Sequence, residues 1–219
     1  MKILLSWSTG KDSAWSLHVL RQQYPGAVAG LLTTVNEAFD RVAMHAVRRS
    51  MLQAQADAAG LPLHVVHIPW PCSNEQYEAV MKTAVNGFLR EGFTHVAFGD
   101  LFLEDVRHYR ESLLARARKL GVFPLWGRET AQLGREFVAS GFRAVIACLD
   151  PKRLDASFAG REYDAFFLDQ LPAEVDPCGE RGEFHTFVYA GPGFPEPIAC
   201  RVGPVVEREG FVFCDIDEA

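Results

Sequence analysis

Residues 6–13 read Ser-Trp-Ser-Thr-Gly-Lys-Asp-Ser, and this short segment decides the fold that we expect. It follows an apolar run at residues 3–5 and precedes an amphipathic stretch at residues 14–20. That order predicts a strand, a tight loop of small residues and the start of a helix. The N–H groups of a first helical turn have no partner within the helix, and the helix dipole adds partial positive charge there. The segment therefore predicts an anion-binding loop.

The side chains of this loop favour a phosphate ligand accompanied by a metal ion. Lys11 adds a full positive charge, and Gly10 allows the backbone to approach a ligand closely. Asp12 does not suit a phosphate alone, but a carboxylate there is a reasonable magnesium ligand. Three further side chains offer hydroxyl groups, namely Ser8, Thr9 and Ser13.

The loop is not a Walker A motif, which would need Gly in place of Leu5 and Ser or Thr in place of Asp12. It instead resembles the PP-loop, S-G-G-x-D-S, of the adenine nucleotide α-hydrolase-like enzymes. Those enzymes cleave ATP between the α and β phosphates and adenylate a substrate. Thr9 stands where they usually have Gly. An ordinary Ser/Gly turn with a helix cap is the alternative, and the strand-loop-helix context favours nucleotide binding.

The composition is that of a globular protein with a proper core. Of its 219 residues, 48% are hydrophobic and 23% charged, and the net charge of −6 makes nucleic acid an unexpected partner. We expect no signal peptide and no membrane span, because the apolar runs are too short. The five cysteines form no C-x-x-C pair, which favours reduced thiols in a cytoplasmic protein.

Strand-like apolar runs alternate with helical patterns along most of the chain. Such alternation predicts a mainly parallel sheet with helices on both faces. After the first strand, strands are expected at residues 27–35, 63–68, 94–98, 122–126 and 143–149. After the first helix, helices are expected at residues 43–59, 73–90, 101–120 and 129–139, the second opened by a capping box of Ser73 and Gln76.

We therefore predict an α/β fold with a doubly wound, mainly parallel sheet over residues 1–150, which would be the nucleotide-binding domain. Residues 151–219 are expected to form a small C-terminal α+β appendage on the acceptor side, with a strand at 184–189 and a hairpin at 202–214. A doubly wound sheet binds its ligand at the carboxyl ends of its strands. The loop at residues 8–13 and Asp100 both follow predicted strands, so both are expected at that edge.

A second group of polar residues lies at positions 176–188, where two glycines bracket two carboxylates. In a strand that begins at Glu183, the side chains of Glu183 and His185 point to the same face. A carboxylate beside an imidazole is a general acid–base arrangement. A solvated turn that leads into a strand is the alternative, and composition alone does not separate the two.

Taken together, residues 8–13 and the run Glu-Arg-Gly-Glu-Phe-His-Thr at 180–186 resemble the diphthine–ammonia ligase family. The resemblance covers roughly the whole chain. It departs from the family at Arg181, where the family usually has Asn, and the planar cation of Arg would favour a more anionic acceptor. Between these two segments, three further stretches match the family in the same order along the chain. They are Met44-His45 with residues 53–56, residues 98–101 and residues 124–126.

The resemblance implies an ATP-dependent amidation of a carboxylate on diphthine, a modified histidine of translation elongation factor 2. The chain would adenylate the carboxylate, release pyrophosphate and let ammonia displace AMP. It would use ATP and Mg²⁺, with ammonia and a carboxylate on a protein or small molecule as the other partners. The acceptor and the oligomeric state stay open, a homo-oligomer included.

The resemblance also implies roles for individual residues. The catalytic candidates are Lys11, Glu180, Glu183 and His185. The nucleotide-binding candidates are Ser8, Thr9, Gly10, Lys11, Asp12, Ser13, His45 and Asp100, of which Asp12 and Asp100 are the expected metal ligands. His45 has packing as an equal alternative, and Arg107 and Arg110 either bind an anion or form a solvated helix face.

Two other functions stay open. One is a PP-loop enzyme that adenylates an RNA base, although paired catalytic cysteines and a basic surface are not evident. The other is a non-catalytic ATP sensor, which would have no use for the acidic and histidine-containing segment at 180–186. Conversion of ATP to AMP separates the sensor from both enzymes.

Overall fold

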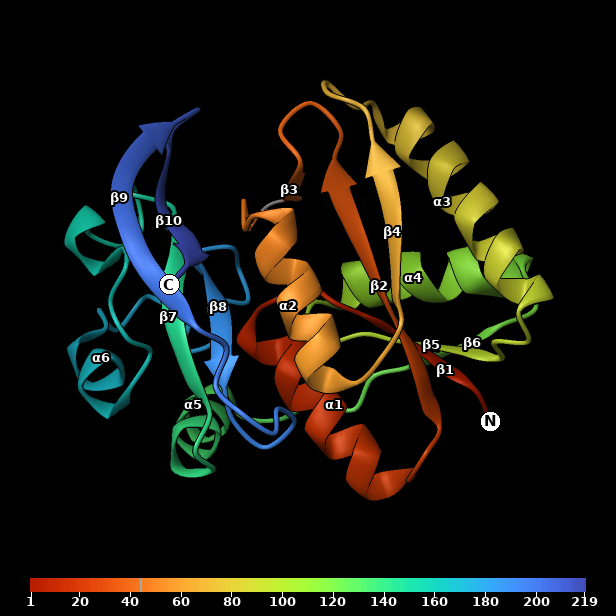
Figure 1. The fold of residues 1–219 in the computed structure, drawn as a ribbon, viewed down its shortest axis with the longest axis horizontal. Coiled ribbons are helices and arrows are strands. Elements are labelled where there is room, and N and C mark those ends of the chain that lie inside the picture. Colours follow the sequence, from red (N-terminus) through yellow and green to blue (C-terminus); the bar gives the residue numbers. More distant parts are fainter. Residues whose placement is uncertain (44) are drawn as a thin grey trace.

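The computed structural model describes residues 1–43 and 45–219 and places two sheets side by side, the first flanked by helices (Figure 1). The strands are β1 (Ile3–Ser6), β2 (Val28–Asn36), β3 (Arg41–Val42), β4 (Leu63–Ile68), β5 (His95–Ala97), β6 (Leu120–Val122), β7 (Arg143–Leu149), β8 (Phe184–Ala190), β9 (Cys200–Arg208) and β10 (Phe211–Glu218). The helices are α1 (Lys11–Gln23), α2 (Arg49–Ala59), α3 (Asn74–Arg90), α4 (Glu104–Arg116), α5 (Thr130–Ala139) and α6 (Ala165–Gln170), with a 3₁₀ turn at Ala156–Phe158. In these two ranges no helix is long and apolar enough to cross a membrane.

The first sheet has six strands in the order β3-β2-β1-β5-β6, with β4 also paired to β2. All of its pairs are parallel except that of β2 with the short β3. The chain passes from β1 to β2 and β4 on one side and then returns to β5 and β6 on the other. The switch point therefore lies between β1 and β5, and the loop at residues 8–13 follows β1 there.

Helices cover both faces of this sheet because alternate residues of β1 point to opposite faces. Ile3 and Leu5 pack in one cluster with Leu17 and Leu20 of α1 and with apolar residues of α2. Leu4 points the other way and joins a cluster built with α3. The predicted doubly wound α/β sheet is confirmed.

The second sheet is antiparallel, with the order β8-β7-β10-β9. The expectation that residues 143–149 extend the parallel sheet is wrong, because β7 pairs with β8 and β10 instead. Six of its seven residues are buried, and a strand covered on both faces is continuously apolar in either kind of sheet. The second sheet thus begins before residue 150, where we had expected the boundary.

Smaller differences have local causes. The helix expected from residue 43 begins at Arg49, because residues 41–42 pair with β2 as β3. The strand expected at 122–126 is a turn after β6, and Pro124 has no N–H for a sheet. The predicted capping box is confirmed: the N–H of Gln76 donates to Ser73 Oγ at 3.2 Å, and its side chain accepts from Ser73 N–H at 2.9 Å.

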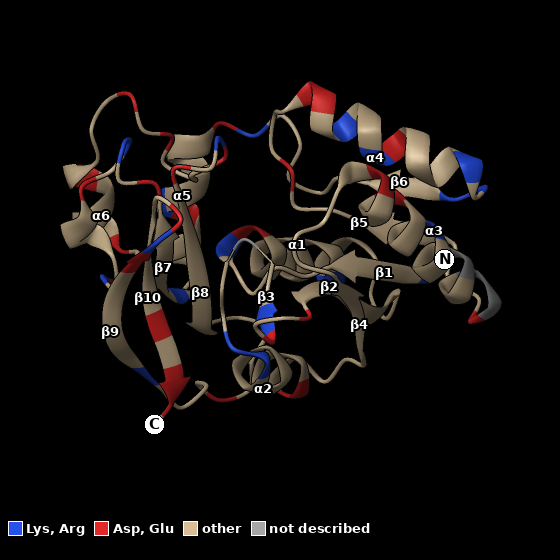
Figure 2. Ribbon diagram, turned by 90° about the horizontal axis from the view of Figure 1, so that it is seen from above, with Lys and Arg blue, Asp and Glu red and all other residues tan. Residues whose placement is uncertain are grey.

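An ion cluster centred on Asp215 of β10 joins the two sheets. Arg48 donates to both carboxylate oxygens, at 2.6 Å from Nη2 to Oδ2 and 3.1 Å from Nε to Oδ1. Arg41 donates to Oδ1 at 2.9 Å. Figure 2 shows this complementarity, with acidic residues along β10 and basic residues on β3 and near α2. Hydrogen bonds from Arg48, and then those from Arg41, lower the pKa of Asp215 to about 2.

We expect Asp215→Asn to lower the free energy of unfolding by about 2 kcal/mol at pH 7, the value of the pKa depression. Because the folded-state pKa is depressed, this contribution is complete above about pH 4 and is lost as the pH falls toward 2. Urea unfolding of both proteins at several pH values measures it. Asp217→Asn is the matched control, since Asp217 lies 3.7 Å from the same Arg48 and should cost much less. Equal losses in the two variants would contradict the account.

Candidate functional site

The loop between β1 and α1 is closed on itself by hydroxyl groups. Ser13 Oγ donates to the carbonyl of Gly10 at 2.9 Å and lies 3.4 Å from Ser8 Oγ. Asp12 and Ser13 occupy the first turn of α1, where N–H groups lie beyond the reach of the helix's own carbonyls. The predicted order of strand, tight loop and helix start is therefore present at the predicted edge of the sheet, and anion binding there stays a prediction.

Gly10 is required by contacts within the protein. A Cβ atom at this position would lie 2.9 Å from Cε1 of His45 and 3.1 Å from the carbonyl oxygen of Thr186 on β8. Thr186 Oγ1 also accepts the N–H of Lys11 at 2.9 Å, so one donor of the first turn is already used. The C-terminal sheet thus forms one wall of the loop. We had expected Gly10 to serve the approach of a ligand. Thr186 belongs to the matched run at 180–186, but no local pattern indicated its contact with this loop.

Thr9 adopts a backbone conformation that favours glycine. Its φ is 74°, in the left-handed region, which costs a non-glycine residue roughly 1–2 kcal/mol. Its side chain is fully buried, and Oγ1 has no hydrogen-bond partner in the described part of the chain. The threonine therefore occupies the PP-loop glycine position at an energetic cost, and in the described part of the chain its hydroxyl group makes no hydrogen bond that would offset this cost.

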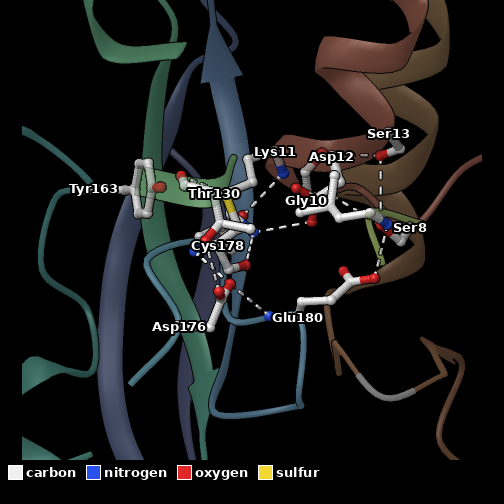
Figure 3. A network of polar contacts seen from close by, with 12 residues as sticks. Ser8, Gly10, Lys11, Asp12, Ser13, Thr130, Tyr163, Asp176, Cys178 and Glu180 are labelled. Carbon is white, nitrogen blue, oxygen red and sulfur yellow. Dashed lines mark hydrogen bonds and ion pairs between the residues drawn. The ribbon is translucent and has the colours of Figure 1, made fainter. Parts of the chain in front are cut away.

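Lys11 points into the protein. Its Nζ donates to Asp12 Oδ2 at 2.9 Å and to the carbonyl of Cys178, and it lies 5.4 Å from the centre of the Phe184 ring (Figure 3). Burial lowers the pKa of Lys11, but Asp12 and Cys178 raise it and the net direction is upward. The ammonium group stays charged beneath the loop. A direct contact of this group with phosphate stays a prediction.

The two expected metal ligands come to the same edge of the sheet. A Cβ at Gly99 would lie 3.0 Å from the backbone carbonyl carbon of Asp12, so the end of β5 touches the start of α1. Asp100 follows directly and binds Arg110, whose Nη2 donates to Oδ1 at 3.1 Å while Nε and Oδ2 are 2.6 Å apart without hydrogen-bond alignment. Burial is the largest influence and raises the pKa of Asp12; Lys11 lowers it, the charges of Asp176 and Asp100 raise it further, and the net direction is upward.

Glu180 reaches this edge from the C-terminal unit. Its Oε1 accepts the N–H of Leu101 at 2.8 Å, which ties the loop before β8 to the connection after β5. Burial, with added repulsion from Asp12 and Asp100, raises the pKa of Glu180 to about 7. Three carboxylates thus share one electrostatic environment. No group of three His, Cys, Asp or Glu side chains in residues 1–43 and 45–219 is placed to hold a metal by itself.

Glu183 and His185 are not brought together. Glu183 is 1% exposed, and its carboxylate accepts the N–H groups of Asp176 at 3.1 Å and Arg181 at 2.9 Å. His185 instead stacks on His45, with ring centres 4.4 Å apart. Burial and the charge of Lys11 lower the pKa of His185 to about 4, so its imidazole is neutral at pH 7. Glu183 shapes the loop, whereas His185 belongs to a cavity.

Asp176 is a loop-building residue that we did not single out. Its Oδ1 accepts the N–H of Cys178 at 2.9 Å, and its Oδ2 accepts the hydroxyl of Thr130 at 2.8 Å. Together with Glu183, it holds residues 176–183 so that Glu180 projects toward the loop after β1 (Figure 3). An Asp side chain that accepts the backbone N–H two residues later forms an Asx turn. The Asp-Pro-Cys order at 176–178 could therefore have indicated this turn from the sequence.

A pocket of about 600 Å³ lies between the carboxyl ends of β2 and β4 and the β9–β10 hairpin. Its wall includes four aromatic side chains, with Phe39 and Trp70 from the first sheet's loops and Phe211 and Phe213 from β10. His185 also lines it, and the ring stacked on His185 is that of His45, which touches Gly10. The pocket therefore adjoins the anion-binding loop across two neutral imidazoles. Our prediction named His185 but none of the aromatic residues.

Arg107 and Arg110 have separate roles. Arg107 lies 4.7 Å from the ring centres of both Phe123 and Trp126 and forms an ion pair with Glu111, so its helix face is partly packed on aromatic rings and not fully solvated, and anion binding by Arg107 stays a prediction. Arg110 stands over Phe98 and holds Asp100. Of the matched stretch at residues 44–45, His45 is described, and Met44 lies outside the described residues.

We expect the carboxyl of Glu180 to titrate with a midpoint near pH 7. Since this folded-state pKa is raised, the contribution of Glu180 to stability is complete below about pH 4 and is lost as the pH rises through 7. Carbon-13 NMR of labelled side-chain carboxyls, assigned by the signal missing from Glu180→Gln, measures the midpoint. The stability of Glu180→Gln relative to the wild type should also increase between pH 5 and 8. A midpoint between pH 4 and 5 would contradict the burial of this group.

Two protein-family models match the chain. The model described as diphthamide synthase N-terminal domain matches residues 1–122, and the one described as diphthamide synthase C-terminal domain matches residues 129–218. The interval between them lies where the chain passes from the first sheet to the second. No match was found among curated proteins. The chain belongs to the diphthamide synthase family and is an enzyme of the PP-loop ATP pyrophosphatase type.

Proposed function

We propose that this protein is an AMP-forming ligase that adenylates a carboxylate and then amidates it with ammonia. The observation that carries the proposal is the loop at residues 8–13, which opens α1 at the switch point of the sheet with carboxylates gathered beside it. A helix N-terminus attracts phosphate, and carboxylates at the same place attract the cation that accompanies a triphosphate. Family membership supports the same reaction class.

The loop residues would bind the phosphates of ATP. The N–H groups of Asp12 and Ser13 and the hydroxyls of Ser8 and Ser13 offer donors at the start of α1. The buried ammonium group of Lys11 would contribute positive charge on the protein side of the loop, and its hydrogen bond to Asp12 would hold that carboxylate in place. These contacts would orient the α-phosphorus toward the acceptor and stabilise the pyrophosphate that leaves.

Magnesium fits the edge of the sheet that carries Asp12, Asp100 and Glu180 if phosphate oxygens complete the coordination of the ion. Besides burial, the charge of Asp100 raises the pKa of Asp12, and the charges of Asp12 and Asp100 raise the pKa of Glu180, so negative charge accumulates at this edge. Mg²⁺ usually keeps several waters and binds one or two carboxylates together with phosphate oxygens, which does not require three protein ligands. Asp12 is the best-placed ligand, since Lys11 contacts only its Oδ2, whereas Arg110 lies against both carboxylate oxygens of Asp100. When bound, the ion would neutralise charge on the phosphates.

The reaction then needs two displacements. An oxygen of the acceptor carboxylate attacks the α-phosphorus, and the bond to the β-phosphate oxygen breaks to release pyrophosphate. Ammonia next attacks the acyl carbon, AMP leaves with the electrons of the acyl–oxygen bond, and the nitrogen loses a proton. His185 and His45 are both neutral at pH 7, because burial lowers the pKa of each, so a ring nitrogen could accept a hydrogen bond from the amine while the proton passes on to water.

The aromatic pocket would hold the body of the acceptor. It adjoins the loop at His185, and the C-terminal unit supplies much of its wall, including Phe211 and Phe213. A largely apolar wall suits a flat or apolar substrate body whose carboxylate reaches the histidine pair.

Turnover should yield AMP and pyrophosphate and should depend on magnesium. We expect Asp12→Asn to weaken the affinity for MgATP by about tenfold or more, because a charged ligand is lost. Phosphorus NMR identifies the products and calorimetry measures the affinity. Asp105→Asn, an exposed carboxylate in the first turn of α4, is the control and should bind like the wild type. ADP as the main product would contradict the reaction class, and ATP binding without AMP would favour a sensor.

Phe211→Ala should raise the KM for the acceptor by about tenfold, the effect of losing one buried aromatic contact, and leave ATP affinity within about threefold of wild type. Steady-state kinetics with the acceptor varied, together with ATP titration, separates the two. Phe166→Ala, on α6 and 63% exposed, is the control for loss of an aromatic ring. If ATP affinity falls in step with acceptor use, the pocket binds the adenine base, and our placement of the acceptor is wrong.

A further inference from the structure

Gln55 of α2 connects three parts of the chain through one buried amide. Its side chain is completely buried. Nε2 donates to the carbonyl of Thr9 at 2.9 Å and to the carbonyl of Val188 at 2.6 Å. Oε1 accepts the indole N–H of Trp7 at 2.8 Å. Each side of the amide is therefore used, and the three partners belong to the end of β1, the anion-binding loop and β8.

The contact with Thr9 falls on the strained residue of the loop. The same carbonyl also accepts the N–H of Val188 at 3.0 Å, so two donors hold it. Since the Thr9 hydroxyl has no partner in the described part of the chain, the backbone carbonyl is the group through which the left-handed conformation is held. That conformation turns the following residues into the first turn of α1.

Only an amide of this length can make the three contacts. Glu has the same shape but no N–H donor, and Met has the length without either polar group. Trp7 fixes the orientation of the amide, because its N–H requires the oxygen on its own side and leaves the nitrogen for the two carbonyls. The arrangement is specific for Gln at position 55.

We propose that Gln55 is a positioning residue for the nucleotide. By anchoring the carbonyl of Thr9 it keeps the loop in the conformation that presents the N–H groups of Asp12 and Ser13 to phosphate, and it couples that conformation to β8. Gln55 does not touch the nucleotide. This inference rests on the proposed ATP site at residues 8–13.

The test is a double-mutant cycle on MgATP affinity. Gln55→Met should weaken binding by about tenfold or more, as expected when a buried polar group loses its partner. Thr9→Gly changes the loop itself and is the reference for the second arm of the cycle, because glycine adopts a positive φ without cost. In the Thr9→Gly background, Gln55→Met should change the affinity by no more than about threefold, since the loop no longer needs the anchor. Gln53→Met, exposed on the same helix, is the matched control and should change nothing.

A second pair of variants covers the case in which Gln55→Met does not fold. Trp7→Phe removes the N–H that orients the amide, together with one of the two rings. It should also weaken MgATP binding. In the Thr9→Gly background that loss should disappear as well. Urea unfolding measures the stability of every variant. A positioning role requires that the loss of MgATP affinity does not simply follow the loss of stability from one variant to the next.

The outcomes distinguish this inference from the function on which it rests. A wild type that binds no MgATP would contradict both. Wild-type binding that survives both Gln55→Met and Trp7→Phe would overturn the role of Gln55 alone. A loss that persists in the Thr9→Gly background would also overturn it, because the effect would then not pass through the strained residue.

Discussion

The packing of β8 against the loop after β1 is the constraint on which the rest of the site depends. Thr186 caps the N–H of Lys11, Val188 donates to the carbonyl of Thr9, and the space beside Gly10 is filled by His45 and Thr186. The loop at residues 8–13 is thus built by both sheets. A phosphate site on the first sheet alone would lack the wall that fixes its conformation, so the nucleotide binding that we propose would depend on the position of the C-terminal unit.

Charge balance is the second organising feature. Lys11 is a buried cation surrounded by carboxylates, and a buried charge is tolerated only when it is paired and hydrogen-bonded. Its pairing with Asp12 and with the carbonyl of Cys178 supplies those partners. Even so, Glu180 remains in an environment that raises its pKa to about 7. The same deficit of positive charge that disfavours ionisation of Glu180 would favour the metal-bound triphosphate that we propose at this edge.

Local features were predictable from the sequence, and long-range ones were not. The apolar run of β1 and the hydroxyls of the loop act over a few residues, so the doubly wound sheet and the strand-loop-helix geometry at residues 3–13 followed from pattern. The apolarity of β7 could not tell an antiparallel partner from a parallel one. Strand parity placed Glu183 and His185 on one face, but only the fold shows that the first binds backbone N–H groups and the second lines a pocket. Thr186 contacts a residue 175 positions away, which no local pattern indicates.

The central claim is that ATP phosphates bind at the start of α1 against the wall formed by β8. A crystal structure with Mg²⁺ and α,β-methylene ATP, which cannot be cleaved between the α and β phosphates, tests it most directly. The account predicts phosphate oxygens within hydrogen-bond distance of the N–H groups of Asp12 and Ser13, with the metal on Asp12 and the Gln55 contact to Thr9 retained. A triphosphate bound elsewhere, with this loop empty, would contradict the account.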